Sequence, residues 1–231
     1  SKYNWFNLGG PADIFFRPEN KNQLKDFLKK IQKLNFKISI IGAGSNTLIR
    51  DSGIKGVVIK LGSKFSQIKL LSENVIEVGA ATLDRKVSDF AKENNISGME
   101  FLSCIPGSVG GAVIMNSGCY GSEISQILYS INILDRYGKE KELKRDEIDF
   151  FYRGCNISEE YLILSAKLTG VLSSKELIIK KREEFIKKKK ISQPSRIKTG
   201  KSTFKNQKQK KAWEIIKEAG CNKFLICDAY I

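Results

Sequence analysis

The chain has 231 residues, 41% of them hydrophobic, and its 40 Lys and Arg exceed its 25 Asp and Glu to give a net charge of +15. The length suffices for one large or two modest domains, and the absence of any long apolar run excludes a transmembrane helix. The sequence contains no histidine, the commonest general base and metal ligand, and we expect no metal site.

The five cysteines do not form the pattern of a disulfide framework. They stand at positions 104, 119, 155, 221 and 227, an odd number without any C-x-x-C pair. This spacing also argues against a structural zinc site, and it favours a reducing compartment. The first residues, SKYNWFNLGG, give no sign of a signal peptide. We therefore expect a cytoplasmic protein.

Positive charge concentrates late in the chain, in KKREEFIKKKK at 180–190 and KNQKQKK at 205–211. A basic protein can bind nucleic acid, an acidic membrane surface or phosphorylated small molecules. Leu177, Ile178 and Phe185 recur at helical spacing around the first run, so a solvated helix face is the simpler interpretation. A surface that binds nucleic acid usually has more aromatic residues among its basic ones, because the bases stack on them. We expect neither nucleic acid nor a membrane as partner.

Apolar periodicity predicts the order strand, helix, strand, strand for roughly the first 60 residues. The helix covers residues 20–34, with Asn20 as its cap. The next two strand patterns lie around Ile68–Leu71 and Val75–Val78. A second helix is expected to begin at a Thr82 cap and to stop at Asn94-Asn95.

The second half of the chain begins with a predicted long loop over residues 98–121. Two strands around Tyr137-Gly138 follow within 131–143, and another strand covers Tyr161–Thr169. The remaining patterns predict a basic helix over about 174–190 and a short helix over 210–219, which Gly220 ends.

Residues 39–53, SIIGAGSNTLIRDSG, form an apolar run that ends in Gly42-Ala43-Gly44 and continues with Ser45 and Asn46. The dinucleotide fingerprint G-x-G-x-x-G fails here, because Thr47 replaces the third glycine and a strand follows instead of a long helix. Such a turn can still hold an anion, since successive backbone N–H groups at glycines form a concave nest. A tight turn without a ligand explains this stretch about equally well.

A second glycine-rich stretch, MEFLSCIPGSVGGAVIMNSGCYGSE, covers residues 99–123 and carries few charges. Ordering glycine on folding costs backbone entropy. This cost is expected where the main chain must lie close against a wide, flat ligand. Together, residues 42–46 and 106–112 can enclose a long ligand with a diphosphate and a flat ring, which is the shape of FAD. The alternative is an ordinary buried loop between a helix and a hairpin.

Several specific motifs follow one another from end to end of the chain. They are N-x-x-F-x-x-G-G-P-A-D from Asn4 to Asp13, GAGSN with IRDSG, EFLSCIPGSVGGA, MNSGCYG, FFYR at 150–153, QPS at 193–195, GKSTFKN at 200–206, AGC at 219–221 and DA at 228–229. In this order they resemble the motifs of the UDP-N-acetylenolpyruvoylglucosamine reductases, flavoenzymes of peptidoglycan and hence cell wall synthesis.

The resemblance implies an α+β protein with a vanillyl-alcohol-oxidase-type FAD-binding fold in two subdomains and a partial α/β substrate-binding domain. We place the FAD-binding subdomains at residues 1–61 and 62–172, and the incomplete substrate-binding domain at 173–231. The implied reaction takes a hydride from NADPH to FAD and then to the enolpyruvyl double bond of a UDP-sugar, which yields UDP-N-acetylmuramate. Residues 154–200 leave no room for a long insertion, so the chain resembles the shorter of the two subtypes. We expect a monomer.

Hydride addition to an enolpyruvyl group leaves negative charge beside its carboxylate, so the site needs a fixed cation and an acid. The resemblance assigns the first role to Arg153, which follows aromatic residues that can hold it desolvated while its guanidinium grips a carboxylate. It assigns the proton to Ser202 in STFKN, with Lys205 as a plausible polarising neighbour. In this motif Lys201 precedes the serine, and Gln207 stands where the family has proline.

The resemblance also implies the binding residues, most of which come from the two glycine-rich stretches. The residues expected to contact FAD are Ile41, Gly42, Ala43, Gly44, Ser45, Asn46, Pro106, Gly107, Ser108, Gly110, Gly111, Ala112, Asn116 and Gly121. The residues expected to contact the substrate are Tyr120, Tyr152, Lys205 and Asn206.

The third catalytic group of the family is a glutamate near the C-terminus, and no residue of this sequence corresponds to it. Glu218 is not a substitute. We expect a C-terminally truncated sequence that is also clipped close to its N-terminus. The 231-residue chain would then bind FAD but reduce the substrate poorly or not at all.

Two other functions stay open. One is another FAD-dependent oxidoreductase of the same fold, such as an alcohol or sugar oxidase, although alcohol oxidation usually needs a base. The other is a basic nucleic-acid-binding protein, which would bind with a steep salt dependence and carry no yellow cofactor.

Overall fold

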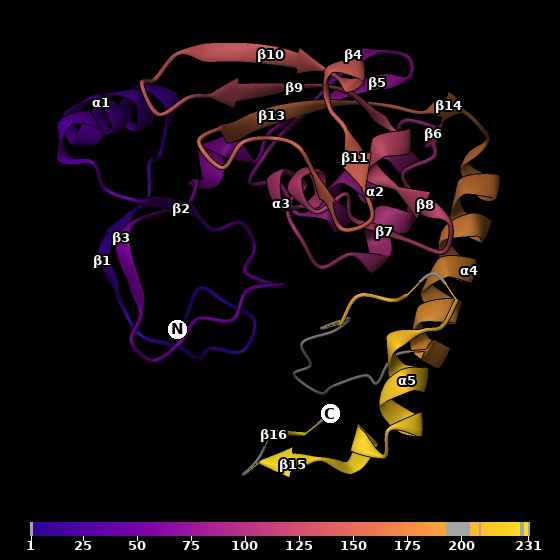
Figure 1. The fold of residues 1–231 in the computed structure, drawn as a ribbon. Coiled ribbons are helices and arrows are strands. Elements are labelled where there is room, and N and C mark those ends of the chain that lie inside the picture. Colours follow the sequence, from indigo (N-terminus) through magenta and orange to yellow (C-terminus); the bar gives the residue numbers. More distant parts are fainter. Residues whose placement is uncertain (1, 193–203, 208, 227–228, 231) are drawn as a thin grey trace. The chain divides into compact units, whose positions relative to one another are not determined.

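The computed structural model describes residues 2–192, 204–207, 209–226 and 229–230. It divides into two compact units, Ser1–Lys198 and Thr199–Ile231. The first unit is built on two β-sheets, one parallel and one antiparallel (Figure 1).

The parallel sheet has three strands in the order β1-β3-β2. Their bounds are β1 (Ala12–Phe16), β2 (Ile38–Ile40) and β3 (Ile54–Ile59). Helix α1 (Lys21–Ile31) and the 3₁₀ helix η1 (Gln32–Leu34), which directly follows it, connect β1 to β2. The Asn20 side chain accepts a hydrogen bond from the Gln23 N–H at 3.0 Å and caps α1. The predicted strand-helix-strand-strand order and the cap are confirmed.

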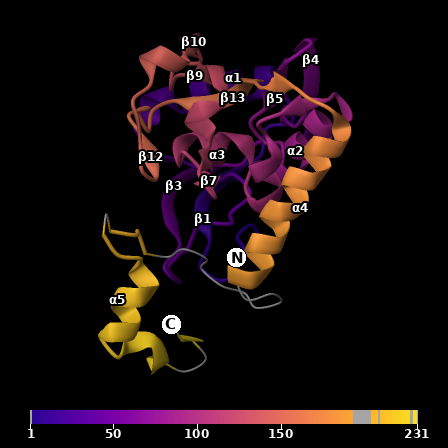
Figure 2. The same ribbon diagram turned by 90° about the vertical axis from the view of Figure 1, so that its right-hand side faces the viewer.

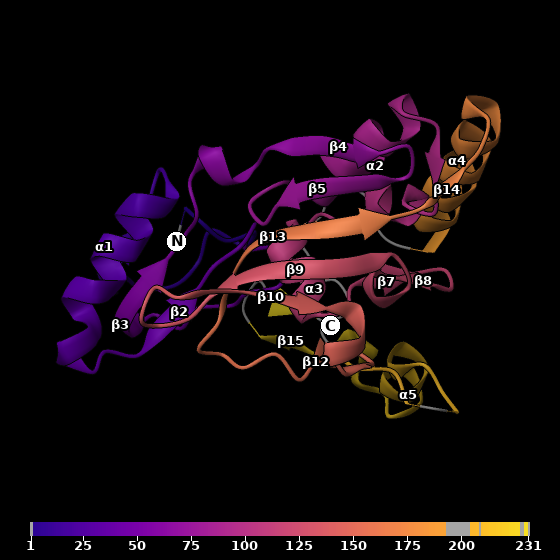
Figure 3. The same cartoon turned by 90° about the horizontal axis from the view of Figure 1, so that it is seen from above.

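The antiparallel sheet has five strands in the order β10-β9-β13-β5-β4 (Figure 3). Their bounds are β4 (Ile68–Ser72), β5 (Val75–Gly79), β9 (Leu128–Leu134), β10 (Glu140–Lys144) and β13 (Leu162–Thr169). In β5, Ile76 and Val78 are buried while Glu77 between them faces outward, the alternation of a sheet with one covered face. All the strands predicted between 68 and 169 are confirmed, with Gly138 at φ 82° in the turn between β9 and β10.

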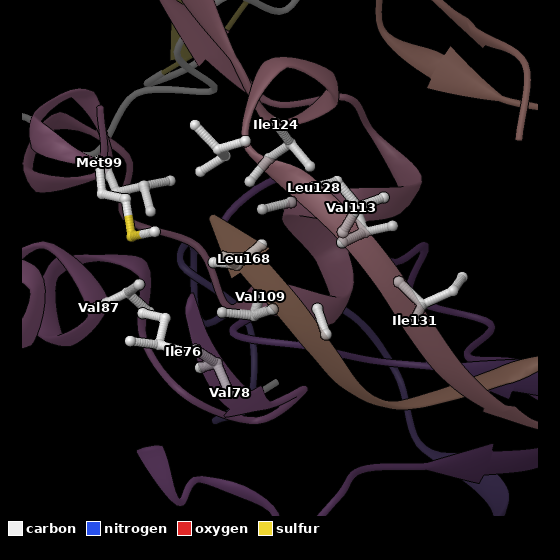
Figure 4. Packing of buried hydrophobic residues seen from close by; sticks show 14 of the residues in the cluster. Ile76, Val78, Val87, Met99, Val109, Val113, Ile124, Leu128, Ile131 and Leu168 are labelled. Atoms are coloured by element: carbon white, nitrogen blue, oxygen red, sulfur yellow. The ribbon is translucent and has the colours of Figure 1, made fainter. Parts of the chain in front are cut away.

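Helices cover one face of the antiparallel sheet (Figures 1 and 2). They are α2 (Asp84–Glu93), η3 (Glu100–Cys104), α3 (Val109–Ile114) and, beside them, α4 (Lys175–Ser192). The core between these helices and the sheet includes Ile76, Val87, Val109, Ile131 and Leu168, all fully buried (Figure 4).

A second apolar cluster joins the two sheets into one unit. It packs Leu24 and Leu28 of α1 and Val57 of β3 with Leu134 and Leu162 from the ends of β9 and β13. Burial of this shared surface fixes the edge of the parallel sheet relative to the antiparallel sheet.

Two predictions about local structure were wrong. Helix α2 begins at Asp84 rather than after a Thr82 cap, because the backbone of Thr82 is bonded to Gly79 and Val109 and its hydroxyl is buried. The predicted loop 98–121 contains η3, α3 and the strand β7 (Gly118–Cys119). Helix α3 forms because Val109, Ala112 and Val113 lie at helical spacing and all three are buried in the core.

The predicted basic helix is confirmed as α4. Ile178 and Phe185 are buried on its inner face, whereas Lys180 and Lys187 are exposed. Arg182 of α4 forms an ion pair with Asp89 of α2 at 2.5 Å. The basic run is thus the solvated side of a packed helix.

The remaining elements of the first unit are short. They are η2 (Ser63–Phe65), β6 (Ile96–Ser97), β7 (Gly118–Cys119), β8 (Ser122–Glu123), η4 (Ile124–Gln126), η5 (Arg145–Glu147), β11 (Phe150–Phe151), β12 (Gly154–Cys155) and β14 (Val171–Leu172).

The second unit contains α5 (Ala212–Glu218), η6 (Cys221–Lys223), β15 (Leu225–Ile226) and β16 (Ala229–Tyr230). Gly220 follows α5 at φ 73°, as the sequence predicted for the end of this helix. Within the described parts of both units, no helix combines the length and the apolar character that crossing a bilayer requires.

Candidate active site

The two glycine-rich stretches meet in the folded chain. The backbone N–H of Ala43 donates a hydrogen bond to the Ser108 hydroxyl at 3.2 Å. A Cβ atom on Gly42 would lie 2.5 Å from the same oxygen, so any other residue here would displace the Ser108 hydroxyl from its position. The two stretches therefore face one another across a common space, as a shared ligand requires.

That space is a cavity of about 630 Å³. This volume lies in the range of small-molecule and cofactor sites. Its lining includes six of the residues predicted to contact FAD, which are Ile41, Gly42, Ala43, Ser108, Gly110 and Gly111.

Positively charged residues line the cavity as well. Among the described residues of this lining, three are cationic, Arg17, Lys37 and Lys60, and one, Glu159, is acidic. The Lys60 ammonium donates a hydrogen bond to the carbonyl of Gly42. Burial lowers the pKa of Lys60, and the nearby charge of Arg17 lowers it further. A surplus of cations, among which Lys60 is half-buried, suits a diphosphate.

Sequence reasoning missed Arg17 and Lys60, although a signal for them existed. Arg17 directly follows β1, Ile41 follows β2 and Lys60 follows β3. The three strands are parallel, so their carboxyl ends lie at one edge of the sheet, the usual place for a ligand in such sheets.

The rest of the lining is largely apolar and comes from distant parts of the chain. Ile114 and Met115 lie at the end of α3, and Ile157, Tyr161 and Ile163 lie between β12 and β13 or within β13. Apolar walls together with a cationic edge fit both parts of FAD, the flat rings and the diphosphate.

The second glycine-rich stretch is held against residues 80–84. Gly110 N–H donates to the Ala80 carbonyl at 2.9 Å, and a Cβ on Gly110 would lie 3.1 Å from the Ala80 Cβ. A Cβ on Gly107 would lie 2.5 Å from a carboxylate oxygen of Asp84. Part of the glycine content of this stretch therefore serves tight packing inside the protein.

Asp84 lies behind this stretch and outside the cavity lining. It is fully buried, and neither of its carboxylate oxygens has a hydrogen-bond partner among the described residues. Burial raises the pKa of Asp84 to about 8, and a backbone interaction with Gly107 opposes this rise only in part. The side chain is therefore largely protonated at neutral pH.

Two short hairpins, β7-β8 and β11-β12, carry three of the predicted catalytic and substrate residues, which are Tyr120, Tyr152 and Arg153 (Figure 1). Tyr120 and Gly121 form the turn between β7 and β8, with φ of 54° and 83°. Tyr152 and Arg153 form the turn between β11 and β12. An Arg153 Nη donates to the carbonyl of Gly118 at 3.5 Å, which links the two hairpins.

Arg153 has an unusual backbone conformation for a bulky residue. Its φ is 65°, and its guanidinium lies 5.2 Å from the centre of the Tyr152 ring. Strain of this kind occurs preferentially at functional sites, where the surrounding structure enforces it. In the other hairpin, the Tyr120 ring stacks on Phe185 at 5.7 Å.

Asn116 connects these hairpins to the end of α3. It is buried, its amide donates to the Phe151 carbonyl at 3.4 Å, and its amide oxygen accepts from the Ser125 N–H at 3.1 Å. Cys155 of β12 also donates to the Ile114 carbonyl, at 3.5 Å. The hairpin that carries Arg153 is thereby attached to a helix that lines the cavity.

The other residues predicted to contact FAD lie outside the cavity lining. They are Gly44, Ser45, Asn46, Pro106, Gly107, Ala112, Asn116 and Gly121. Gly44 accepts a hydrogen bond from the Trp5 N–H at 2.9 Å and has no room for a Cβ beside the Tyr3 carbonyl. Close packing against the N-terminal segment therefore explains why residue 44 is a glycine.

Ser202 lies outside the described residues. Lys205 and Asn206 belong to the second unit, where both are exposed. The Asn206 amide oxygen accepts a hydrogen bond from the Ala212 N–H at 3.0 Å, at the start of α5.

Comparison with known proteins gives a consistent result. Residues 12–144 match the model of a family described as FAD binding domain. The chain is 45% identical over 233 residues to the UDP-N-acetylenolpyruvoylglucosamine reductase of Pelagibacter ubique (strain HTCC1062), and this match covers 100% of the chain and 77% of the relative. It is 41% identical over 222 residues to the enzyme of that name from Wolbachia sp. subsp. Drosophila simulans (strain wRi), covering 96% of the chain and 74% of the relative.

The fold gives the same answer. The crystal structure of UDP-N-acetylenolpyruvylglucosamine reductase from Thermus caldophilus matches 100% of this chain and 81% of its own length, with a TM-score of 0.87 and 29% sequence identity. The architecture predicted from the motifs, an α+β FAD-binding fold, is confirmed. On both its sequence and its fold, the chain belongs to the UDP-N-acetylenolpyruvoylglucosamine reductase family.

Proposed function

We propose that this protein is an FAD-dependent reductase that converts UDP-N-acetylglucosamine enolpyruvate to UDP-N-acetylmuramate in peptidoglycan synthesis, with NADPH as hydride donor. One structural observation supports the proposal independently of family membership. The two glycine-rich stretches meet at the Ala43–Ser108 hydrogen bond and border one cavity, which has a cationic edge and apolar walls.

The cavity residues would hold FAD in a simple division of roles. Arg17 and Lys60, at the carboxyl edge of the parallel sheet, would neutralise the diphosphate, while Ile114, Met115 and Tyr161 would pack against the rings. When bound, FAD accepts a hydride from NADPH and supplies it to the substrate. The protein contributes position, exclusion of water and fixed charge.

Arg153 is the proposed group that stabilises the enolate. Its guanidinium stays charged at any physiological pH and carries five N–H donors. Among the described residues, its one hydrogen bond is the long 3.5 Å contact to Gly118, which leaves donors for the substrate carboxylate. Tyr120 and Tyr152, in the same two hairpin turns, are the proposed substrate contacts of the first unit.

Ser202 is the proposed proton donor to the substrate carbon, and Lys205 and Asn206 are proposed to contact the substrate. These three assignments rest on the STFKN motif. We also propose the division into subdomains 1–61 and 62–172 and a substrate-binding domain from 173. Support for the first boundary comes from the two separate sheets on either side of it.

We further propose that the protein is cytoplasmic and monomeric. Cys104, Cys119, Cys155 and Cys221 carry free thiols, as is usual in a reducing compartment. Size-exclusion chromatography with light scattering tests the monomer, which a mass of twice 26.0 kDa would exclude.

The test of the function is spectroscopic. Purified protein mixed with FAD and desalted should retain an absorption band at roughly 450 nm, the signature of a bound flavin. NADPH should bleach this band, and UDP-N-acetylglucosamine enolpyruvate should restore it under anaerobic conditions, slowly where the 231-residue chain is tested by itself. A protein that retains no flavin refutes the site. A bound flavin that alcohols or sugars reduce, and that the enolpyruvyl UDP-sugar does not reoxidise, favours an oxidase of the same fold.

A further inference from the structure

Arg145, the first residue of η5, contacts the segments at the base of both hairpins of the candidate active site. Its Nε donates a hydrogen bond of 2.8 Å to the carbonyl of Ser125, which lies in η4 directly after β8. Its guanidinium carbon lies 4.7 Å from the centre of the ring of Phe150, the first residue of β11. One side chain thus connects the hairpin that carries Tyr120 to the hairpin that carries Arg153.

A third contact attaches Arg145 to the core. An Nη of Arg145 donates to the carbonyl of Ile148 at 2.9 Å, and the Ile148 N–H donates back to the Arg145 carbonyl at 3.3 Å. Ile148 is 2% exposed and belongs to the core under the antiparallel sheet. Because the guanidinium is planar and its donors point in fixed directions, it can bind two separate carbonyls while its plane lies against a ring. Contacts to three residues therefore fix its position.

Asn116 binds the same two segments. Its amide oxygen accepts a hydrogen bond from the Ser125 N–H at 3.1 Å, and its amide nitrogen donates to the Phe151 carbonyl at 3.4 Å. Both backbone polar groups of Ser125 are therefore bound by side chains that also reach β11, Arg145 through the ring of Phe150 and Asn116 through the main chain. These two side chains hold the two hairpins next to one another.

The partners of Arg145 indicate a geometric role. Arg145 is half-buried, and both of its hydrogen bonds within the described parts of the chain go to backbone carbonyls, not to a carboxylate. By contrast, Arg136 pairs with Glu160 and Arg182 pairs with Asp89. Burying a cation costs free energy that a carboxylate partner would offset. The shape of the donor fork, and not neutralisation of an acid, therefore explains an arginine at this position.

We propose that Arg145 is a positioning residue for Arg153. Strands β11 and β12 pair over only two residues each, and so short a hairpin needs outside contacts to hold one orientation. The contacts of Arg145 with Ser125 and Phe150 supply this orientation. They keep an Nη of Arg153 within 3.5 Å of the Gly118 carbonyl in the other hairpin. The effect on catalysis rests on the proposed function of Arg153, whereas the effect on the hairpin does not.

The test variant is Arg145→Lys. Lysine keeps the positive charge, but it has neither a fork that donates to two carbonyls in fixed directions nor a plane that lies against Phe150. Arg136→Lys is the matched control. Arg136 is also half-buried, and its guanidinium also lies near an aromatic ring, that of Tyr137 at 5.9 Å, but it contacts neither hairpin.

Hydrogen exchange of the backbone, measured by mass spectrometry of peptic peptides, tests the hairpin without ligand or activity. The segment 149–156 contains β11, the turn and β12, and it is closed by a hydrogen bond of 3.0 Å from the Asn156 N–H to the Asp149 carbonyl. Its amides should exchange several-fold faster in Arg145→Lys than in the parent and in Arg136→Lys. Exchange in β9 should be the same in all three proteins, which shows that the fold is intact.

Stopped-flow absorbance of the FAD-loaded full chain tests the effect on catalysis. Arg145→Lys should retain FAD, because Arg145 does not line the cavity. At saturating UDP-N-acetylglucosamine enolpyruvate, reoxidation of the reduced flavin should be about 10-fold slower than in the parent, since the guanidinium of Arg153 is misplaced. In an Arg153→Gln background the same change should slow the step by less than about 2-fold, because a positioning residue acts only through the group that it positions.

Each outcome decides one part of the proposal. Exchange at 149–156 that equals that of the parent would overturn it. An equal loss of rate in both backgrounds would also overturn it, since Arg145 would then act independently of Arg153. Faster exchange with an unchanged rate would refute the link to catalysis. If the enolpyruvyl UDP-sugar does not reoxidise the flavin of the parent, the proposed function fails, and hydrogen exchange still decides whether Arg145 holds the hairpin.

Discussion

Ala43 and Ser108, which lie 65 positions apart, are joined by a hydrogen bond of 3.2 Å from a backbone N–H to a hydroxyl. Ala43 belongs to the turn after β2, and Ser108 directly precedes α3. The bond therefore fixes the edge of the parallel sheet to the helix layer of the antiparallel sheet, and the cavity lies along this junction.

The first prediction concerns this junction. Gly42→Ala places a Cβ 2.5 Å from the Ser108 Oγ, so we expect it to weaken FAD binding about 10-fold, since the Ser108 side chain must rotate away or the two stretches must separate. Ser108→Ala should weaken binding by about 1 kcal/mol, through loss of the acceptor for Ala43 N–H. FAD titration by fluorescence measures both.

The double variant is the control. With Ala at 108, the oxygen that the new Cβ meets is gone, and the next contact, the Ser108 Cβ at 3.9 Å, is ordinary. Gly42→Ala in the Ser108→Ala background should therefore cost about 1 kcal/mol less than Gly42→Ala alone. If the losses of binding free energy in the two single variants simply add up in the double variant, the predicted clash between the new Cβ and the Ser108 Oγ does not exist.

The second prediction concerns the cationic edge. Lys60→Met keeps the apolar stem and removes the charge, and it should raise the dissociation constant for FAD about 10-fold. Lys64→Met, a change to an exposed lysine of η2, is the matched control and should bind FAD like the parent. An equal loss of FAD affinity in both variants would show that the net charge of the protein, and not Lys60 itself, determines binding.

The same lysine gives a pH dependence. Because burial and Arg17 lower the pKa of Lys60 below its usual value, its charge is lost earlier than that of an ordinary lysine as pH rises. FAD affinity of the parent should fall at alkaline pH, and the fall should be smaller in Lys60→Met.

The third prediction concerns Arg153. Arg153→Gln should retain FAD, because Arg153 does not line the cavity, but it should slow reoxidation of the reduced flavin by the enolpyruvyl UDP-sugar by about 100-fold or more. Arg136→Gln removes a surface arginine paired with Glu160 at 3.2 Å and should leave this rate unchanged. Stopped-flow absorbance measures the step. A rate equal to that of the parent in Arg153→Gln would exclude the proposed role.

The fourth prediction concerns stability and Asp84. The folded-state pKa of about 8 lies above the usual value of 3.8, so the folded protein holds a proton that the unfolded chain releases. Stability is then highest below the unfolded pKa, falls as pH rises between the two values and levels off above the folded pKa. Asp84→Asn should remove this slope and raise the free energy of unfolding at pH 7 by on the order of 2 kcal/mol.

Urea denaturation at several pH values measures the effect. Asp89→Asn, a change to a half-buried carboxylate on the same helix that pairs with Arg182, is the comparison and should not remove the slope. A parent protein whose stability does not fall between pH 5 and 7 would show that Asp84 is ionised when folded.

The elements of this fold could be read from local patterns, because apolar spacing and caps act over a few residues. The helix capped by Asn20 and the strands of the antiparallel sheet are examples. The prediction that Thr82 caps the second helix was wrong because the Thr82 carbonyl accepts a hydrogen bond from the distant Val109. Helix propensity does not reveal such a contact. Likewise α3 was predicted to be loop, since its glycines hide a helix that burial in the core stabilises.

For the site, the sequence alone determined the family and the two glycine-rich stretches, because the motifs are contiguous in the chain. Only the tertiary structure decided that Arg17 and Lys60 join Gly42 at one edge, since that depends on the parallel order of three strands. It alone also decided that Asp84 is buried and that no side chain among the described residues pairs with its carboxylate. Local sequence sets the conformation of a segment, whereas burial and the pairing of side chains depend on which distant segments pack together.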